Sequence, residues 1–118
     1  MIQSFRDLQV FKKSYELTIK VYKIARTFPK EEMFGLTSQI KRAAYSIPLN
    51  IAEGYGKRKS PQEFKRFLLM AIGSSDEMSV ILELAKDLDL IPVEMYVELS
   101  KDYTEVGKML TGLMQNWK

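Results

Sequence analysis

Apolar residues recur three and four positions apart along almost the whole chain, with breaks near Pro29, Pro61 and Pro92. This spacing predicts four amphipathic helices, at about residues 5–28, 36–55, 61–87 or 88, and 92–116. Short connections between long helices favour an antiparallel up-and-down arrangement. The sequence therefore predicts an all-α fold, a four-helix bundle that forms a single domain over residues 1–118.

The first predicted helix carries two apolar stripes. At about 100° per residue, one stripe gathers Leu8, Phe11, Tyr15, Tyr22 and Ala25. The other stripe gathers Val10, Leu17, Val21, Ile24 and Phe28. Because one stripe suffices for packing inside a small bundle, we expect the second stripe to form a subunit interface. The alternative is that a central bundle helix simply has a broad buried face.

Pro48 interrupts the second predicted helix. It lacks the amide that would bond the Ala44 carbonyl, and its ring crowds the preceding turn, so we expect a bend near these two residues. Asn50 and Glu53 are polar residues that flank the bend. They either satisfy freed backbone groups or line an interface or channel.

Strong stop and start signals separate the second helix from the third. Gly54 and Gly56 stand where a left-handed C-terminal cap would end the second helix. Ser60 with Glu63 three residues later forms a capping box, and Pro61 occupies the first helical position, where a missing amide costs nothing. We therefore expect the third helix to begin at Pro61.

Basic residues gather around this connection. Cations beside a helix C-terminus interact favourably with the helix dipole, and free amides at the next helix N-terminus attract phosphate. The candidate nucleic-acid-binding residues are Lys41, Arg42, Lys57, Arg58, Lys59, Lys65 and Arg66. These cations either contact a polyanion or have only structural and solubility roles.

Charge is distributed unevenly along the chain. Residues 1–66 contain 14 Lys or Arg and 6 Asp or Glu, for a net charge of +8, whereas residues 67–118 contain 4 and 9, for a net charge of −5. In a bundle of long helices such a split makes one surface basic and another acidic. It favours either a polyanion partner or charge complementarity between subunits or helices.

Several classes of function lack the residues they need. The chain contains no His and no Cys, so the common general base, the thiol nucleophile and the soft metal ligands are missing. We therefore expect no enzyme, no cofactor, no metal and no small-molecule substrate. No apolar run approaches the roughly 18 residues of a membrane span, and the N-terminus lacks a signal core, so a cytoplasmic protein is expected.

The motif SIPLNIAEGYG at residues 46–56, with LTSQIKRAAY before it and FRDLQVFKKSYEL at residues 5–17, resembles the S23, or 23S rRNA intervening-sequence, protein family. The resemblance extends to about Pro92. It implies a four-helix bundle that assembles into a homopentamer around a central channel. Some members of this family are encoded inside insertions in large-subunit ribosomal RNA genes. A related branch, the accessory variability determinants of diversity-generating retroelements, associates with a reverse transcriptase and binds nucleic acid.

The residues and the resemblance together predict a non-catalytic oligomeric scaffold. In the first hypothesis it contacts RNA, or a nucleic-acid enzyme such as a reverse transcriptase, through the basic connection. In the alternative it is a purely structural homo-oligomer that binds a protein partner and no nucleic acid.

Overall fold

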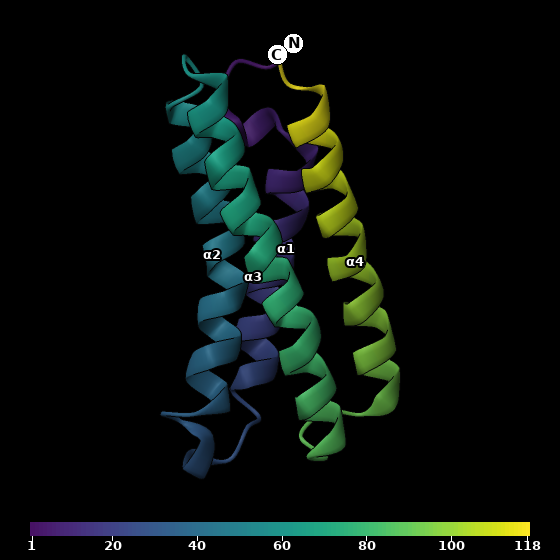
Figure 1. The fold of residues 1–118 in the computed structure, drawn as a ribbon. Helices are drawn as coiled ribbons and strands as arrows, with labels where there is room; N and C mark the ends of the chain where they lie inside the picture. The colour runs from purple at the N-terminus through teal and green to yellow at the C-terminus, as the bar shows by residue number, and fades with distance from the viewer.

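A computed structural model describes residues 1–118 and contains four long α-helices and no strand. The helices are α1 (Gln9–Ala25), α2 (Leu36–Gly56), α3 (Pro61–Asp87) and α4 (Val93–Asn116), with short 3₁₀ segments at Phe5–Asp7 and Lys30–Glu32. The predicted all-helical fold with four helices is confirmed. Figure 1 shows both termini and the α2–α3 connection at one end, and the α1–α2 and α3–α4 connections at the other. None of the helices combines the length and apolar character needed to cross a membrane.

The first helix begins four residues later than the periodicity predicts. Ser4 and Asp7 form a capping box, but it caps a 3₁₀ turn. Leu8 then adopts an extended conformation, with φ −72° and ψ 127°, and α1 starts only at Gln9. The capping signal near the N-terminus is therefore genuine, but the turn that it caps does not continue into the helix.

The four helices enclose one hydrophobic core, a cluster of 25 buried residues. Its largest fully buried side chains include Tyr103, Phe64, Ile40, Leu68, Met78 and Leu82. Burial of this many apolar side chains is the main stabilising contribution for a chain with no disulfide. Tyr103 adds a buried hydroxyl without a hydrogen-bond partner, and burial raises the pKa of that hydroxyl.

The structure contradicts the prediction that the second stripe of the first helix forms a subunit interface. Four members of that stripe lie in the core of their own chain, and the fifth is partly buried against it: Val10, Leu17, Val21 and Phe28, and then Ile24. On the helical wheel, Leu17 and Val21 fall between Lys13, which pairs with α4, and Thr18, which bonds to α2. The contacts of α1 with α4 on one side and with α2 on the other therefore place this stripe against the core.

Helix α2 continues without interruption through Pro48. The Ala44 carbonyl, which loses its usual donor to the proline, accepts a hydrogen bond from the Thr18 hydroxyl of α1 at 3.2 Å. The same hydroxyl lies 2.7 Å from the Ser14 carbonyl of its own helix, so its proton is shared. Helix α1 thus supplies the hydrogen-bond donor that the proline lacks. The bend near Pro48 stays a prediction.

Gly54 allows α2 and α3 to approach closely. A Cβ atom at this position would lie 2.6 Å from Phe67 Cβ and 3.1 Å from Phe64 Cδ1, whereas one at Gly56 would meet nothing within 4 Å. No glycine in the chain has a positive φ, and both glycines belong to α2. The predicted left-handed cap is therefore wrong: Gly54 is required by helix packing, not by a turn.

We predict opposite outcomes for two glycine substitutions in α2. Gly54→Ala forces a Cβ into Phe67 and should lower the free energy of unfolding by about 1–2 kcal/mol, because overpacking exceeds the gain in helix propensity. Gly56→Ala is the matched control and should be neutral or stabilising by up to about 1 kcal/mol. Urea denaturation measures both values. Equal effects of the two substitutions would contradict the close approach.

We also predict energetic coupling between Thr18 and Pro48. Thr18→Val should cost about 1–2 kcal/mol, since it leaves the Ala44 carbonyl without a donor. In a Pro48→Ala background the restored backbone amide bonds that carbonyl, so the same substitution should cost about 1 kcal/mol less. A double-mutant cycle measured by denaturation tests this. Thr27→Val, which removes a hydroxyl bonded to its own helix, is the control and should show no coupling with Pro48.

Candidate functional site

The basic turn, defined as Lys57, Arg58 and Lys59, joins α2 to α3 at the end of the bundle that also holds both termini (Figure 1). The Arg58 guanidinium lies 4.2 Å from the centre of the Tyr55 ring and donates to the Tyr55 carbonyl at 3.0 Å. The Lys57 ammonium lies 5.8 Å from the centre of the Phe67 ring. All three cations are exposed and none forms an ion pair. The turn therefore presents uncompensated positive charge from a well-anchored position.

Three aromatic side chains form a cluster next to this turn. Tyr55, Phe64 and Trp117 pack edge to face, with ring centroids 6.0 Å apart for Tyr55–Phe64, 6.3 Å for Tyr55–Trp117 and 4.7 Å for Phe64–Trp117. Such pairs add roughly 0.5–1.5 kcal/mol each beyond the area that they bury. The cluster ties the ends of α2 and α4 to the start of α3, so the basic turn has a rigid base.

The start of α3 is less available to an anion than the sequence predicts. Ser60 accepts a hydrogen bond from the Glu63 amide at 3.2 Å, as a capping residue should, and Pro61 has no amide. The Glu63 carboxylate does not complete the capping box, because it forms a bidentate pair with Arg66 at 3.0 and 3.1 Å. This pairing lowers the pKa of Glu63 and raises the pKa of Arg66. Arg66 is therefore already neutralised in part, and little of the helix N-terminus remains free.

The structure brings only some of the predicted basic residues together. Lys65 and Arg66 lie one to two turns into α3, close to the basic turn. Lys41 and Arg42 do not join them, because about 16 residues of helix, or roughly 24 Å, separate Lys41 from Lys57. The Lys41 ammonium instead lies 5.2 Å from the centre of the Tyr22 ring on α1. The two groups of cations occupy different parts of the bundle.

The polar residues of the central motif have separate environments. Asn50 donates its side-chain amide to the Ser46 carbonyl at 2.8 Å, one helical turn earlier. The carbonyl that Pro48 leaves without a donor is that of Ala44, so this bond is not the predicted bond to a freed backbone group. Glu53 is exposed and makes no hydrogen bond or ion pair, although its charge contributes to the raised pKa of Arg66.

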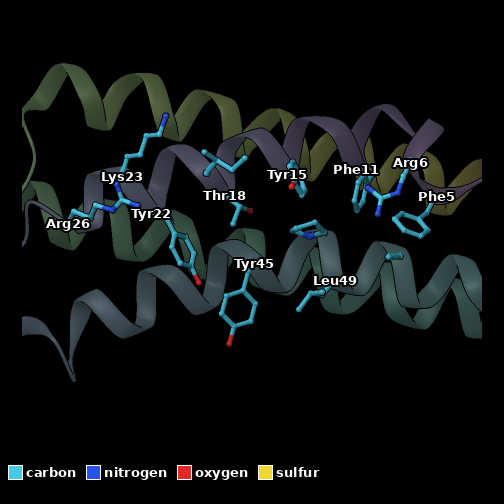
Figure 2. Close-up of a pocket in the computed structure, with 13 residues that line it drawn as sticks. Phe5, Arg6, Phe11, Tyr15, Thr18, Tyr22, Lys23, Arg26, Tyr45 and Leu49 are labelled. Carbon is cyan, nitrogen blue, oxygen red and sulfur yellow. The ribbon is translucent and has the colours of Figure 1, made fainter.

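A second candidate site, which the sequence reasoning missed, is an apolar groove between α1 and α2. The groove has a volume of about 660 Å³, and Figure 2 shows the side chains that line it. We call it the α1–α2 groove and define it by its apolar members Phe5, Phe11, Tyr15, Ile19, Tyr22, Tyr45 and Leu49. Tyr15, Ile19 and Leu49 are 50%, 46% and 59% exposed. Three cations and no carboxylate share the lining: Arg6, Lys23 and Arg26.

One signal for this groove is present in the sequence. Leu49 lies outside the narrow apolar stripe of α2, on its polar side, where a large aliphatic residue has no role in the core. Tyr15 and Tyr22 belong to the stripe that the sequence predicts to pack inside the bundle. Leu8, Phe11 and Ala25 of that stripe are buried, so α1 has the broad buried face given as the alternative, and only the part of the stripe around Tyr15 and Tyr22 lines the groove.

The carboxylates of the chain do not form a metal-binding group: no three of them come together in a suitable cluster. The candidate sites are therefore the basic turn and the α1–α2 groove, one basic and one apolar.

Comparisons with known proteins agree with this architecture. No curated protein sequence matches the chain. Among solved structures, it is similar to the crystal structure of a protein with unknown function from the S23 ribosomal protein family of Bacteroides thetaiotaomicron, with a TM-score of 0.82 and 27% sequence identity. That similarity covers 91% of this chain and 99% of the other. The family model described as 23S rRNA-intervening sequence protein matches residues 6–112, so this chain belongs to the 23S rRNA-intervening sequence protein family.

Proposed function

We propose that this protein is a non-catalytic, self-associating binding protein of the cytoplasm that contacts RNA through the basic turn. The observation that carries the proposal is the uncompensated charge of Lys57, Arg58 and Lys59 on a connection anchored by aromatic packing. Exposed cations that are held in place lose little conformational freedom when they meet phosphate. They also release counterions from RNA on binding, which favours association at low salt.

The contact is to phosphate and not to bases. Tyr55 is buried, and its ring and that of Phe67 lie beneath the cations of the turn. Neither ring is free for the stacking that sequence-tolerant single-strand binders use. Phosphate contacts position a protein on nucleic acid without reading its sequence. The basic turn therefore favours structured RNA in general.

Self-association compensates for the small number of cations in each chain. The three cations of one turn bind phosphate weakly, but several basic turns on one assembly engage the same RNA with a higher effective concentration. A homopentamer, the assembly that the family resemblance implies, carries five copies of the turn. A nucleic-acid enzyme such as a reverse transcriptase is the protein partner that would share this RNA.

The α1–α2 groove favours a second candidate function, a purely structural homo-oligomer that binds a protein partner and no nucleic acid. An apolar groove of this size with half-exposed aromatic and aliphatic side chains is typical of protein contacts. The two functions differ in whether RNA binds at all.

We predict salt-dependent RNA binding that requires the basic turn. Fluorescence anisotropy of a labelled structured RNA, from about 50 to about 200 mM salt, should give a steep negative slope of log affinity against log salt. Lys57→Ala, Arg58→Ala and Lys59→Ala together should make the slope shallower by roughly 2–3, because each cation removed leaves about one phosphate with its counterions still bound.

The matched control removes three exposed lysines elsewhere, Lys30, Lys101 and Lys108, with the same change in net charge. This variant should retain most of the affinity. Because Arg58 also bonds the end of α2, the pair Lys57→Ala and Lys59→Ala tests the turn with that hydrogen bond intact. If the wild-type protein does not bind RNA at low salt, the structural homo-oligomer remains as the function.

A further inference from the structure

Helix α3 carries an exposed apolar stripe on its outer face. Leu69, Val80, Leu84 and Leu88 are 58%, 58%, 46% and 57% exposed. At about 100° per residue they fall within one arc of roughly 100°, on the side of α3 that faces away from the core. Single exposed leucines are common, but Val80, Leu84 and Leu88 lie on successive turns of one face, with Leu69 further along the same arc. An apolar row of this kind favours contact with a partner. We call these four residues the α3 stripe.

The α3 stripe and the α1–α2 groove cannot meet within one chain. The groove is formed by α1 and α2, and the stripe belongs to α3. Between them, α2 presents a polar ridge that includes the exposed residues Arg42 and Glu53. A single chain therefore has two separate apolar surfaces, and neither is covered.

The two surfaces carry opposite charge. The groove is lined by Arg6, Lys23 and Arg26, with no carboxylate. Three exposed carboxylates that form no ion pair lie within or beside the stripe: Asp76, Glu77 and Glu83. The cations near its two ends are already paired, Arg66 with Glu63 and Lys86 with Asp87. Contact between two grooves would oppose cation to cation, and contact between two stripes would oppose carboxylate to carboxylate. Groove against stripe is the arrangement in which the charges attract.

The lengths of the two surfaces also agree. From Leu69 to Leu88 the stripe extends about 28 Å along α3, and from Phe11 to Arg26 the groove extends about 22 Å along α1. A helix that lays an apolar face into a groove between two helices is a common mode of protein recognition.

We propose that the α1–α2 groove of one copy binds the α3 stripe of the next copy, head to tail. The proposal rests on the self-association proposed above and names the surfaces that produce it. Each contact leaves one groove and one stripe unused, so copies add until the rotation between neighbours closes a ring. This arrangement covers both apolar surfaces of every copy.

Mixing two defective variants tests the pairing. Ile19→Glu with Leu49→Glu places carboxylates in the groove, and Val80→Lys with Leu84→Lys places ammonium groups on the stripe. All four positions are at least 46% exposed, so the fold should be retained, and circular dichroism checks this. Multi-angle light scattering should show an oligomer for the wild-type protein and a monomer for each variant alone. The equimolar mixture should reassociate, because it contains one intact groove and one intact stripe that can meet.

The matched control is Val93→Lys with Val97→Lys on α4, where the side chains are 59% and 58% exposed. This variant should assemble as the wild-type protein does. If only the groove variant is monomeric, or if the mixture stays monomeric, the head-to-tail pairing is overturned while the proposed function stands. If both variants assemble normally, the named surfaces are wrong. A monomeric wild-type protein overturns self-association itself.

Discussion

The close packing of α2 on α3 at Gly54 is the constraint on which the rest of the structure depends. With Phe67 Cβ only 2.6 Å from where a side chain would begin, no residue but glycine fits without movement. This approach brings Tyr55 and Phe64 into edge-to-face contact and sets the base of the basic turn. On its other side α2 is held by the Thr18 hydroxyl of α1 at the carbonyl that Pro48 leaves without a donor. The central motif thus positions three helices at once.

Local signals along the chain fix where the helices lie. Ser60 and Pro61 start α3 where their chemistry predicts, and Pro29 and Pro92 mark the other connections. The start of α1 differs from the prediction because Leu8 is extended, which no periodicity reveals. The apolar periodicity also does not predict how α1 is rotated about its axis relative to the core. The two apolar stripes look equivalent on a helical wheel, and most residues of both are buried. Only the packing of α1 against α2 and α4 decides that Tyr15 stays exposed.

Which residues come together in the candidate sites depends on distances in the fold that the sequence does not reveal. The charge of the basic turn is predictable because its residues are adjacent in sequence. Lys41 shares only their charge, and the length of α2 keeps it roughly 24 Å away. The Glu63 carboxylate has two suitable partners, and its choice of Arg66 over the Ser60 amide depends on side-chain geometry. The α1–α2 groove lies between two helices, so neither helix alone could reveal it. Gly54 is a further example. A glycine in the sequence is compatible with either a turn or close helix packing, and only the structure distinguishes the two.

The position of Trp117 has a practical consequence. It is the single tryptophan of the chain, and its ring centroid lies 4.7 Å from that of Phe64, under the connection that presents the charges. Its intrinsic emission therefore comes from one place and reports on the solvation of that end of the molecule without any added dye.

Because the C-terminus lies at this end of the molecule, a purification tag fused after Lys118 would emerge beside the exposed cations. A flexible acidic tag at that point would compete with phosphate for them, so a tag is better placed on an internal loop at the far end, such as residues 30–35.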